Sequence, residues 1–162
     1  MKSKSFDGMV CSIARALETI GDRWAILILR DLSLGLSRYE DLRQSSGITN
    51  ATLSDRLKHL EGNDLIERRQ YQSNPARYEY FLTRKGREIR LLTQALVQIG
   101  DKWAVAEDQR PPLRFVDGKT GRAVKLALVD AETEEVKTRD VIPHEGPGAD
   151  DLIRWRLTYL KK

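Results

Sequence analysis

Apolar residues in the first part of the chain recur mostly with the 3.6-residue period of a helix. In residues 11–20, four of them share one face at i, i+3, i+4 and i+7: Ile13, Ala16, Leu17 and Ile20. Gly21 follows this segment as a helix-stop signal. Residues 22–34 are apolar on nearly every side, so we expect them to form the central buried helix, with Asp22 at its N-terminus.

Two shorter helices are predicted next, joined by a glycine-bearing turn. Ser37 and Glu40 have the spacing of a capping box, in which Ser37 is the N-cap of a third helix. A fourth helix is predicted for residues 49–62, capped by Thr49 or Asn50, with a buried stripe formed by Leu53, Leu57 and Leu60. A helix pair of this kind, with a polar outer face on the second helix, is typical of a helix-turn-helix.

A β-hairpin and a long helix are predicted after the helix pair. Residues 65–72 and 77–83 alternate apolar and polar side chains around a turn, so they form a hairpin in the position of a wing. From Thr83 to about Val105 the apolar positions approach a seven-residue repeat: Ile89, Leu92, Leu96, Ile99 and Trp103. Such a stripe of apolar side chains either packs on a partner molecule or covers the core of its own domain.

The pattern changes at residues 110–112, where Arg-Pro-Pro ends the long helix. Beyond it, residues 113–117, 122–130 and 135–142 have the pattern of strands, and residues 149–160 that of a final helix. We therefore predict an α+β protein in two parts. Residues 1–108 form a winged helix-turn-helix domain with a long dimerisation helix, and residues 109–162 form a small β-rich C-terminal extension that ends in a helix.

Charge is unevenly distributed between these parts. Residues 1–104 carry 17 Lys and Arg against 13 Asp and Glu, whereas residues 105–162 carry 11 of each. The whole basic surplus of the chain therefore lies in its first part, as expected for a module that binds a polyanion with an appendage that does not.

Other classes of protein find little support in the sequence. Two acid pairs, Glu134-Glu135 and Asp150-Asp151, are accompanied by no base, nucleophile or metal cluster. Gly118-Lys119-Thr120 lacks the upstream glycine of a phosphate loop, so we expect no enzyme activity, metal or cofactor. The longest apolar run is far shorter than a membrane span of about 20 residues. The N-terminus has no apolar signal-peptide stretch, and we expect a cytoplasmic protein.

The chain resembles the HxlR family, a branch of the MarR-like winged helix-turn-helix bacterial transcriptional regulators. The resemblance spans residues 11–103 and is carried by many short motifs in order. The tail from about Arg110 lies outside it. They include Cys11-Ser12-Ile13-Ala14-Arg15-Ala16-Leu17, Ile20-Gly21-Asp22-Arg23-Trp24, Ser37-Arg38-Tyr39-Glu40-Asp41-Leu42, Leu53-Ser54-Asp55-Arg56-Leu57, Pro75-Ala76-Arg77-Tyr78-Glu79-Tyr80 and Gly100-Asp101-Lys102-Trp103. Ser12 departs from the proline that usually follows the cysteine. The resemblance implies a sequence-specific regulator, a repressor of nearby genes.

The fourth helix is the expected reader of double-stranded DNA, because a major groove admits one α-helix. Its outward and N-terminal residues suit contacts with base edges: Thr49, Asn50, Ala51, Thr52 and Asp55. Arg56 has several open roles, which are contact with a guanine, contact with a phosphate, or an ion pair with Asp55 or Glu61. Arg38, Arg43 and Lys58 are expected to contact phosphates. The helical pattern also places His59 on the side of the fourth helix that points away from the core. Arg77 resembles the family's wing arginine, which reaches the minor groove or its phosphates, and its alternative role is a cross-strand pair with a glutamate such as Glu67.

A homodimer is expected because one winged helix reads too few base pairs to find one operator in a genome. Pairing through the long helix and residues 11–20 predicts an inverted-repeat operator. Cys11, the lone cysteine, is either a small packing residue or, as the resemblance implies for some members, a sensor of oxidants. A small-molecule effector is the other input we consider. The alternative function is a winged-helix module that binds a protein or RNA.

Overall fold

The computed structural model describes residues 5–106, 110–137 and 141–161. They divide into two compact units, of which the larger is Thr19–Lys125 and the smaller combines the described parts of residues 1–18 and 126–161. Each unit is described by itself below. The predicted division between residues 108 and 109 follows the sequence pattern and stays a prediction.

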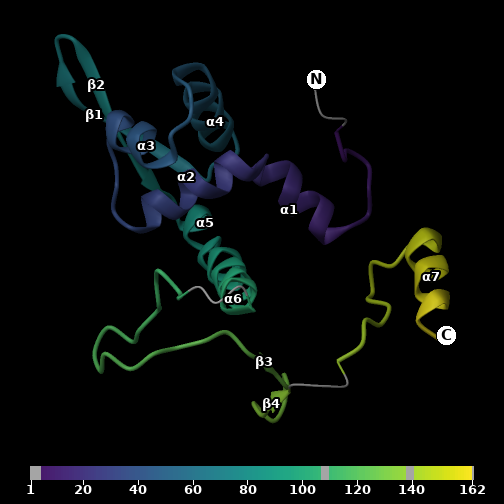
Figure 1. Ribbon diagram of the computed structural model, residues 1–162. Coiled ribbons are helices and arrows are strands. Elements are labelled where there is room, and N and C mark those ends of the chain that lie inside the picture. The colour runs from purple at the N-terminus through teal and green to yellow at the C-terminus, as the bar shows by residue number, and fades with distance from the viewer. Residues whose placement is uncertain (1–4, 107–109, 138–140, 162) are drawn as a thin grey trace. The chain divides into compact units, whose positions relative to one another are not determined.

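Three helices form the centre of the larger unit, as predicted: α2 (Arg23–Ser33), α3 (Tyr39–Ser46) and α4 (Asn50–Gly62). They follow α1 (Ser12–Ile20), which ends at Gly21. In Figure 1, α3 and α4 lie beside α2, and both helices contact it. These helices, together with the hairpin described below, make the protein an α+β winged helix-turn-helix.

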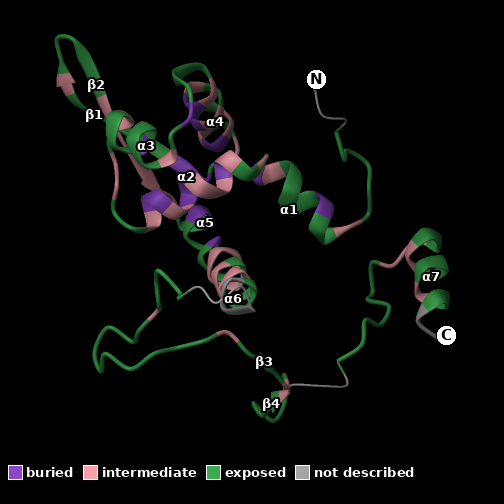
Figure 2. Ribbon diagram, in the orientation of Figure 1, coloured by how far each residue is buried: buried purple, intermediate pink, exposed green. Residues whose placement is uncertain are grey.

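The hydrophobic core is built around α2, which is buried along much of its length (Figure 2). Ala25, Ile28 and Leu29 have no exposed surface. The predicted stripe of α4 packs into the same core, since Leu53, Leu57 and Leu60 are at most 3% exposed. Burying this stripe fixes which face of α4 points outward.

Local capping signals determine where α2 and α4 begin. Asp22 caps α2, because its Oδ1 accepts hydrogen bonds from the amides of Trp24 (3.0 Å) and Ala25 (3.1 Å). Thr49 caps α4 by accepting from the amide of Thr52 at 3.3 Å, so Thr49 and not Asn50 is the N-cap.

The predicted capping box at Ser37 is wrong. Arg38 is the N-cap of α3, and it makes no side-chain capping bond. The reason lies in the tertiary structure: the Ser37 carbonyl accepts from the Tyr80 amide at 2.8 Å, and Arg38 forms an isolated β-bridge with Glu79. These residues are held extended against the hairpin, so the helix begins one residue later than the sequence pattern suggests.

The predicted wing is an antiparallel hairpin of β1 (Ile66–Ser73) and β2 (Ala76–Leu82). Its base is fixed by Ile66, which pairs with Leu82 and is 2% exposed, whereas its tip extends away from the helices (Figure 1). The register shifts between Gln70 and Gln72, and this bulge leaves Tyr71 exposed.

The single long helix predicted from Thr83 is instead two helices, α5 (Arg84–Arg87) and α6 (Arg90–Ala106). Thr83 is the expected cap, and its hydroxyl accepts from the Gly86 amide at 3.0 Å. The chain then tightens, because the Ile89 amide bonds to the Gly86 carbonyl three residues back. This turn buries Ile89 in the core before the chain continues as α6.

The extension contains less sheet than predicted. Residues 113–125 belong to the larger unit and make only the bridge between Val116 and Ala123, around the expected turn at Asp117. The smaller unit has the two-residue strands β3 (Leu128–Val129) and β4 (Val136–Lys137), followed by α7 (Asp151–Leu157) and η1 (Thr158–Lys161).

The difference has a physical reason. Leu128 and Val136 are 61% and 60% exposed, so no apolar layer formed by the described residues covers these short strands. A two-stranded ribbon is marginal without such a layer. The predicted strand over residues 135–142 also crosses residues 138–140, which lie outside the described residues.

Candidate nucleic-acid interface

The outward face of α4 lies opposite its buried leucines. Ala51, Asp55 and Lys58 are exposed at i, i+4 and i+7, which places them on one side of the helix. Asn50 is exposed in the first turn, next to the cap. The structure therefore brings together four of the residues that the sequence predicts to face DNA.

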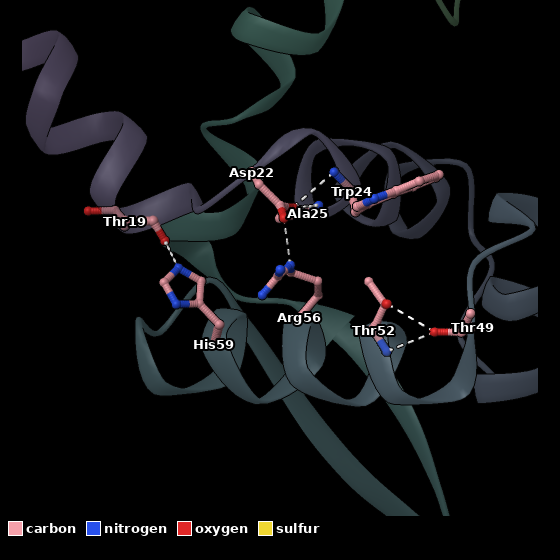
Figure 3. A network of polar contacts seen from close by, with 8 residues as sticks. All are labelled: Thr19, Asp22, Trp24, Ala25, Thr49, Thr52, Arg56 and His59. Atoms are coloured by element: carbon pink, nitrogen blue, oxygen red, sulfur yellow. Dashed lines mark hydrogen bonds and ion pairs between the residues drawn. The ribbon is translucent and has the colours of Figure 1, made fainter. Parts of the chain in front are cut away.

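The start of α4 is organised by short polar contacts. Thr49 and Thr52 are joined by a hydrogen bond between their hydroxyls (3.0 Å), in addition to the capping bond (Figure 3). From α3, the Tyr39 hydroxyl donates to the Asn50 carbonyl (2.9 Å) and contacts the Ser54 hydroxyl (3.0 Å). These contacts connect the two helices of the motif at the end that approaches base edges in helix-turn-helix proteins.

Arg56 does not point outward with the other predicted contacts. Its Nε donates to Asp22 Oδ2 at 2.8 Å, and neither Asp55 nor Glu61 is its partner. His59, which the helical pattern also places outside, lies against the end of α1 with Nε2 3.2 Å from the Thr19 carbonyl oxygen (Figure 3). The partners are 34 and 40 positions away, so neither contact has a local signal in the sequence.

Two of the three expected phosphate contacts already have acidic partners. Arg38 donates to Glu79 at 3.1 Å and stacks on Tyr71, with its guanidinium carbon 5.1 Å from the ring centre. The hydrogen bond to Glu79 raises the pKa of the Arg38 guanidinium, which is charged at any physiological pH. Arg43 is paired with Glu40 one helical turn away, at 2.9 Å.

Lys58 and Arg77 differ from these arginines. Within the part of the chain that the structure describes, neither forms an ion pair, and both are exposed. Arg77 lies opposite Gln72 in the hairpin, so it is not a cross-strand partner of Glu67. Unpaired cations are free to neutralise phosphates without first breaking an internal contact.

Arg38 and Arg77 line one groove, although they are far apart in the sequence. The groove has a volume of about 590 Å³ and lies between α3 and the hairpin. Tyr71 and Tyr78 also line it, while Glu40 and Asp41 supply negative charge at the α3 side. Two basic groups are thereby placed next to the helix-turn-helix.

Sequence reasoning considered Arg68 and Arg69 as phosphate contacts or as exposed strand residues, but it did not predict their partners in the structure. Arg68 pairs with Glu61 of α4 at 3.1 Å and stacks on Tyr78, with its guanidinium carbon 4.9 Å from the ring centre. Arg69 pairs with Glu67 and stacks on Phe81 at 4.7 Å. The available signal was the presence of arginines in one strand and of aromatic residues in the other, because such side chains can pair across adjacent strands.

The described residues give no support to a metal site or to a membrane-spanning helix. They contain no group of three or more His, Cys, Asp or Glu side chains placed to hold a metal ion. In the same residues, no helix is long and apolar enough to cross a membrane.

Cys11, the candidate redox residue, is half-buried and lies just before α1.

Comparisons with known proteins agree with this geometry. Residues 19–108 match the HxlR-like helix-turn-helix family. The chain is 37% identical to an uncharacterized HTH-type transcriptional regulator of Mycobacterium bovis, over 90% of this chain and 91% of that protein. A match of this length includes most of residues 109–162, so similarity to that protein extends beyond the winged domain.

Solved structures give the same result. PA1374 from Pseudomonas aeruginosa, a candidate transcription factor, is 33% identical with a TM-score of 0.62, over 90% of this chain and 99% of that one. The redox regulator HypR in its reduced form is 25% identical with a TM-score of 0.55, over 60% of this chain and 99% of that one.

Proposed function

The chain belongs to the HxlR-like helix-turn-helix family and is a DNA-binding transcriptional regulator, and we propose that it recognises an inverted-repeat operator as a homodimer. The observation that carries this proposal is the outward face of α4, where Asn50, Ala51, Asp55 and Lys58 lie free of the core, while the wing supplies the unpaired Arg77. We propose repression as the outcome of binding, and the cytoplasm as the place where it occurs. No catalytic reaction is part of the proposal.

Residues of this face divide by the kind of contact that we assign to them. Asn50 and Asp55 suit hydrogen bonds to adenine and to the cytosine amine, and Thr49, Ala51 and Thr52 suit contact with a thymine methyl group. Lys58, Arg77, Arg38 and Arg43 suit phosphates, of which the last two would exchange an internal carboxylate for DNA. Base contacts give sequence preference, whereas phosphate contacts give affinity and salt dependence.

Dimerisation is supported by apolar side chains that α6 leaves uncovered. Leu96 and Ile99 are each 43% exposed and Trp103 is 70% exposed, at positions that share one stripe of the helix. Ile13 and Leu17 of α1 are likewise exposed, at 72% and 42%. We propose that a second copy covers these side chains, since a two-fold pair presents two recognition helices to two half-sites.

The test is a selection from random duplex DNA with purified, reduced protein, followed by titration of the selected duplex and of a scrambled one at two salt concentrations. We expect an enriched inverted repeat that is bound at least about 1,000-fold more tightly than scrambled DNA. Absence of enrichment, or a preference for RNA, would refute this function and favour the winged-helix interaction module.

Variants separate the two kinds of contact. Lys58→Ala and Arg77→Ala should weaken binding to both duplexes and lower the salt slope by about one each. Asn50→Ala should weaken operator binding by about 1–3 kcal/mol and leave scrambled DNA unchanged. Lys119→Ala, in an exposed turn of the extension, is the matched control and should change neither quantity.

Two inputs are proposed for the regulator. Similarity to the redox regulator HypR supports Cys11 as an oxidant-sensitive thiol. If oxidation releases the operator from the native protein but not from Cys11→Ser, the Cys11 thiol is the sensor. An equal response of both proteins would refute this role for Cys11. For a small-molecule effector, the open groove of about 630 Å³ between α6 and residues 111–125 is the proposed site.

A further inference from the structure

Two polar side chains of α4 reach back to the junction between α1 and α2. Arg56 and His59 lie three residues apart, so they share one side of the helix. In Figure 3 both point from α4 toward this junction, Arg56 to Asp22 and His59 to the Thr19 carbonyl. The recognition helix is therefore held by more than its buried leucines.

Asp22 serves two helices with one carboxylate. Its Oδ1 accepts from the amides of Trp24 and Ala25 and so begins α2, while its Oδ2 accepts from Arg56 Nε at 2.8 Å. The side chains are partly shielded, at 39% exposed for Asp22 and 34% for Arg56. Because Oδ1 is fixed by the cap, Oδ2 is a rigid acceptor, and Arg56 holds α4 against a defined point of the fold.

Gly21 makes room for the second contact. It adopts a φ of +101°, and a Cβ at this position would lie 3.1 Å from His59 Nε2. The imidazole packs over the bare backbone of the junction, where Nε2 is 3.2 Å from the Thr19 carbonyl oxygen and 3.4 Å from Asn63 Nδ2. Two attachment points one turn apart on the same side of α4 resist its rotation about the helix axis more strongly than either point alone.

Rotation of α4 matters for reading a base sequence. With side chains, a helix has a radius of about 5–6 Å, so a turn of about 20° moves a side-chain end by about 2 Å. Hydrogen bonds to base edges tolerate a few tenths of an ångström. The leucine stripe fixes which face of α4 points outward, but apolar contacts are not directional, so they set the exact rotation less sharply than a hydrogen-bonded ion pair does.

We infer that Arg56 is a positioning residue. The Asp22–Arg56 pair, together with His59, sets the rotation of α4 so that Asn50 and Asp55 meet the bases, and Arg56 itself does not touch the DNA. The inference rests on the DNA-binding function proposed above. It also gives a role to the Asp22 contact of Arg56, a partner that the sequence pattern did not suggest.

The test removes each side of the pair separately. Arg56→Ala removes the donor, and Asp22→Asn removes the charge at Oδ2 but keeps a side-chain oxygen that caps α2 as well as aspartate does. Arg56→Lys restores the positive charge without the planar guanidinium. Glu88→Gln, which loses an exposed carboxylate at the end of α5, is the matched control for Asp22→Asn.

Operator and scrambled DNA are titrated at several salt concentrations with every variant, after far-ultraviolet circular dichroism has shown that each is folded. We expect Arg56→Ala and Asp22→Asn each to weaken operator binding about tenfold, within the coupling range of residues in one network. The variant that carries both Arg56→Ala and Asp22→Asn should bind the operator as tightly as either single variant, because the two residues act as one pair. Scrambled-DNA affinity and the salt slope should stay unchanged, and Arg56→Lys should recover part of the loss.

A direct contact with DNA gives the opposite pattern. If Arg56 touches a phosphate, Arg56→Ala lowers the salt slope by about one and weakens both duplexes, as expected for Lys58→Ala. Asp22→Asn would then leave operator binding unchanged or tighten it, because the carboxylate competes for Arg56. Either result overturns the inference while operator binding by the native protein stands. A native protein that prefers no sequence refutes the proposed function itself, and the inference with it.

Discussion

Replacing Gly86 with alanine should destabilise the winged domain, although the position is helical and open to alanine in its backbone angles. Gly86 lies in α5 directly against the start of the wing. A Cβ there would lie 1.9 Å from the Leu65 carbonyl oxygen and 2.9 Å from its carbon. Close contacts between carbon and a carbonyl oxygen are about 3.3 Å or longer, so the backbones must separate by more than about 1 Å.

That separation would also disturb hydrogen bonds, because the Leu65 carbonyl is an acceptor. The Leu65 oxygen accepts from the Thr83 amide at 3.1 Å and from the Thr83 hydroxyl at 3.3 Å. Forced expansion of a packed site costs about 1–3 kcal/mol, and a weakened buried hydrogen bond costs about 1 kcal/mol more. The alanine gains about 0.4–1 kcal/mol from a less flexible unfolded chain, which does not compensate. We expect a net loss of about 2–3 kcal/mol.

The measurement is urea unfolding followed by tryptophan fluorescence, because Trp24 packs against the core. Native and variant protein are compared at one concentration, since association raises apparent stability. Gly62→Ala is the matched control: Gly62 is the last residue of α4, and a Cβ there meets no atom within 4 Å. That variant should be as stable as the native protein or slightly more stable.

A Gly86→Ala protein as stable as Gly62→Ala would refute the reasoning. It would mean that α5 shifts away from the wing without loss, and that the contact with Leu65 does not define the packing at the base of the hairpin. An equal loss in both variants would point instead to a general effect of replacing glycine, independent of the carbonyl contact.

Three further results are expected. Thr49→Ala removes the cap of α4 and should reduce the free energy of unfolding by about 1 kcal/mol in urea titrations. Leu96→Glu with Ile99→Glu should yield a folded monomer by sedimentation, because both side chains are exposed in the single chain and only pairing would bury them. Hydrogen bonds from Thr120 lower the pKa of the Asp117 carboxyl, so the turn should persist at neutral pH and open as pH falls through this lowered pKa. The Thr120 amide shift would report it by NMR, and a midpoint at the ordinary aspartate pKa would contradict it.

Sequence alone determined the order and type of the elements in residues 11–83. The caps at Asp22, Thr49 and Thr83 were predictable because a capping side chain bonds to an amide two or three residues away. The leucine stripe of α4 was predictable for the same reason, since a helical period is a local property. The wing followed from its position and its two-residue alternation.

Tertiary structure decided which polar side chains remain free. Arg38 and Glu79 are 41 positions apart, and Arg56 and Asp22 are 34 apart, so nothing in the local pattern distinguishes these paired arginines from the unpaired Arg77. The same long-range pairing moved the start of α3, because Ser37 bonds to the hairpin and not to its own helix.

Packing against the rest of the fold also decided the structure of the predicted long helix and of the extension, which the local sequence pattern did not predict correctly. A continuous periodic pattern predicted one helix after Thr83, but burying Ile89 in the core requires a turn between α5 and α6. In residues 113–137, strand-like alternation produced only a bridge and two-residue strands. Alternation specifies which side chains share a face, whereas a strand persists only where another layer covers that face, and the neighbouring layer is a property of the fold.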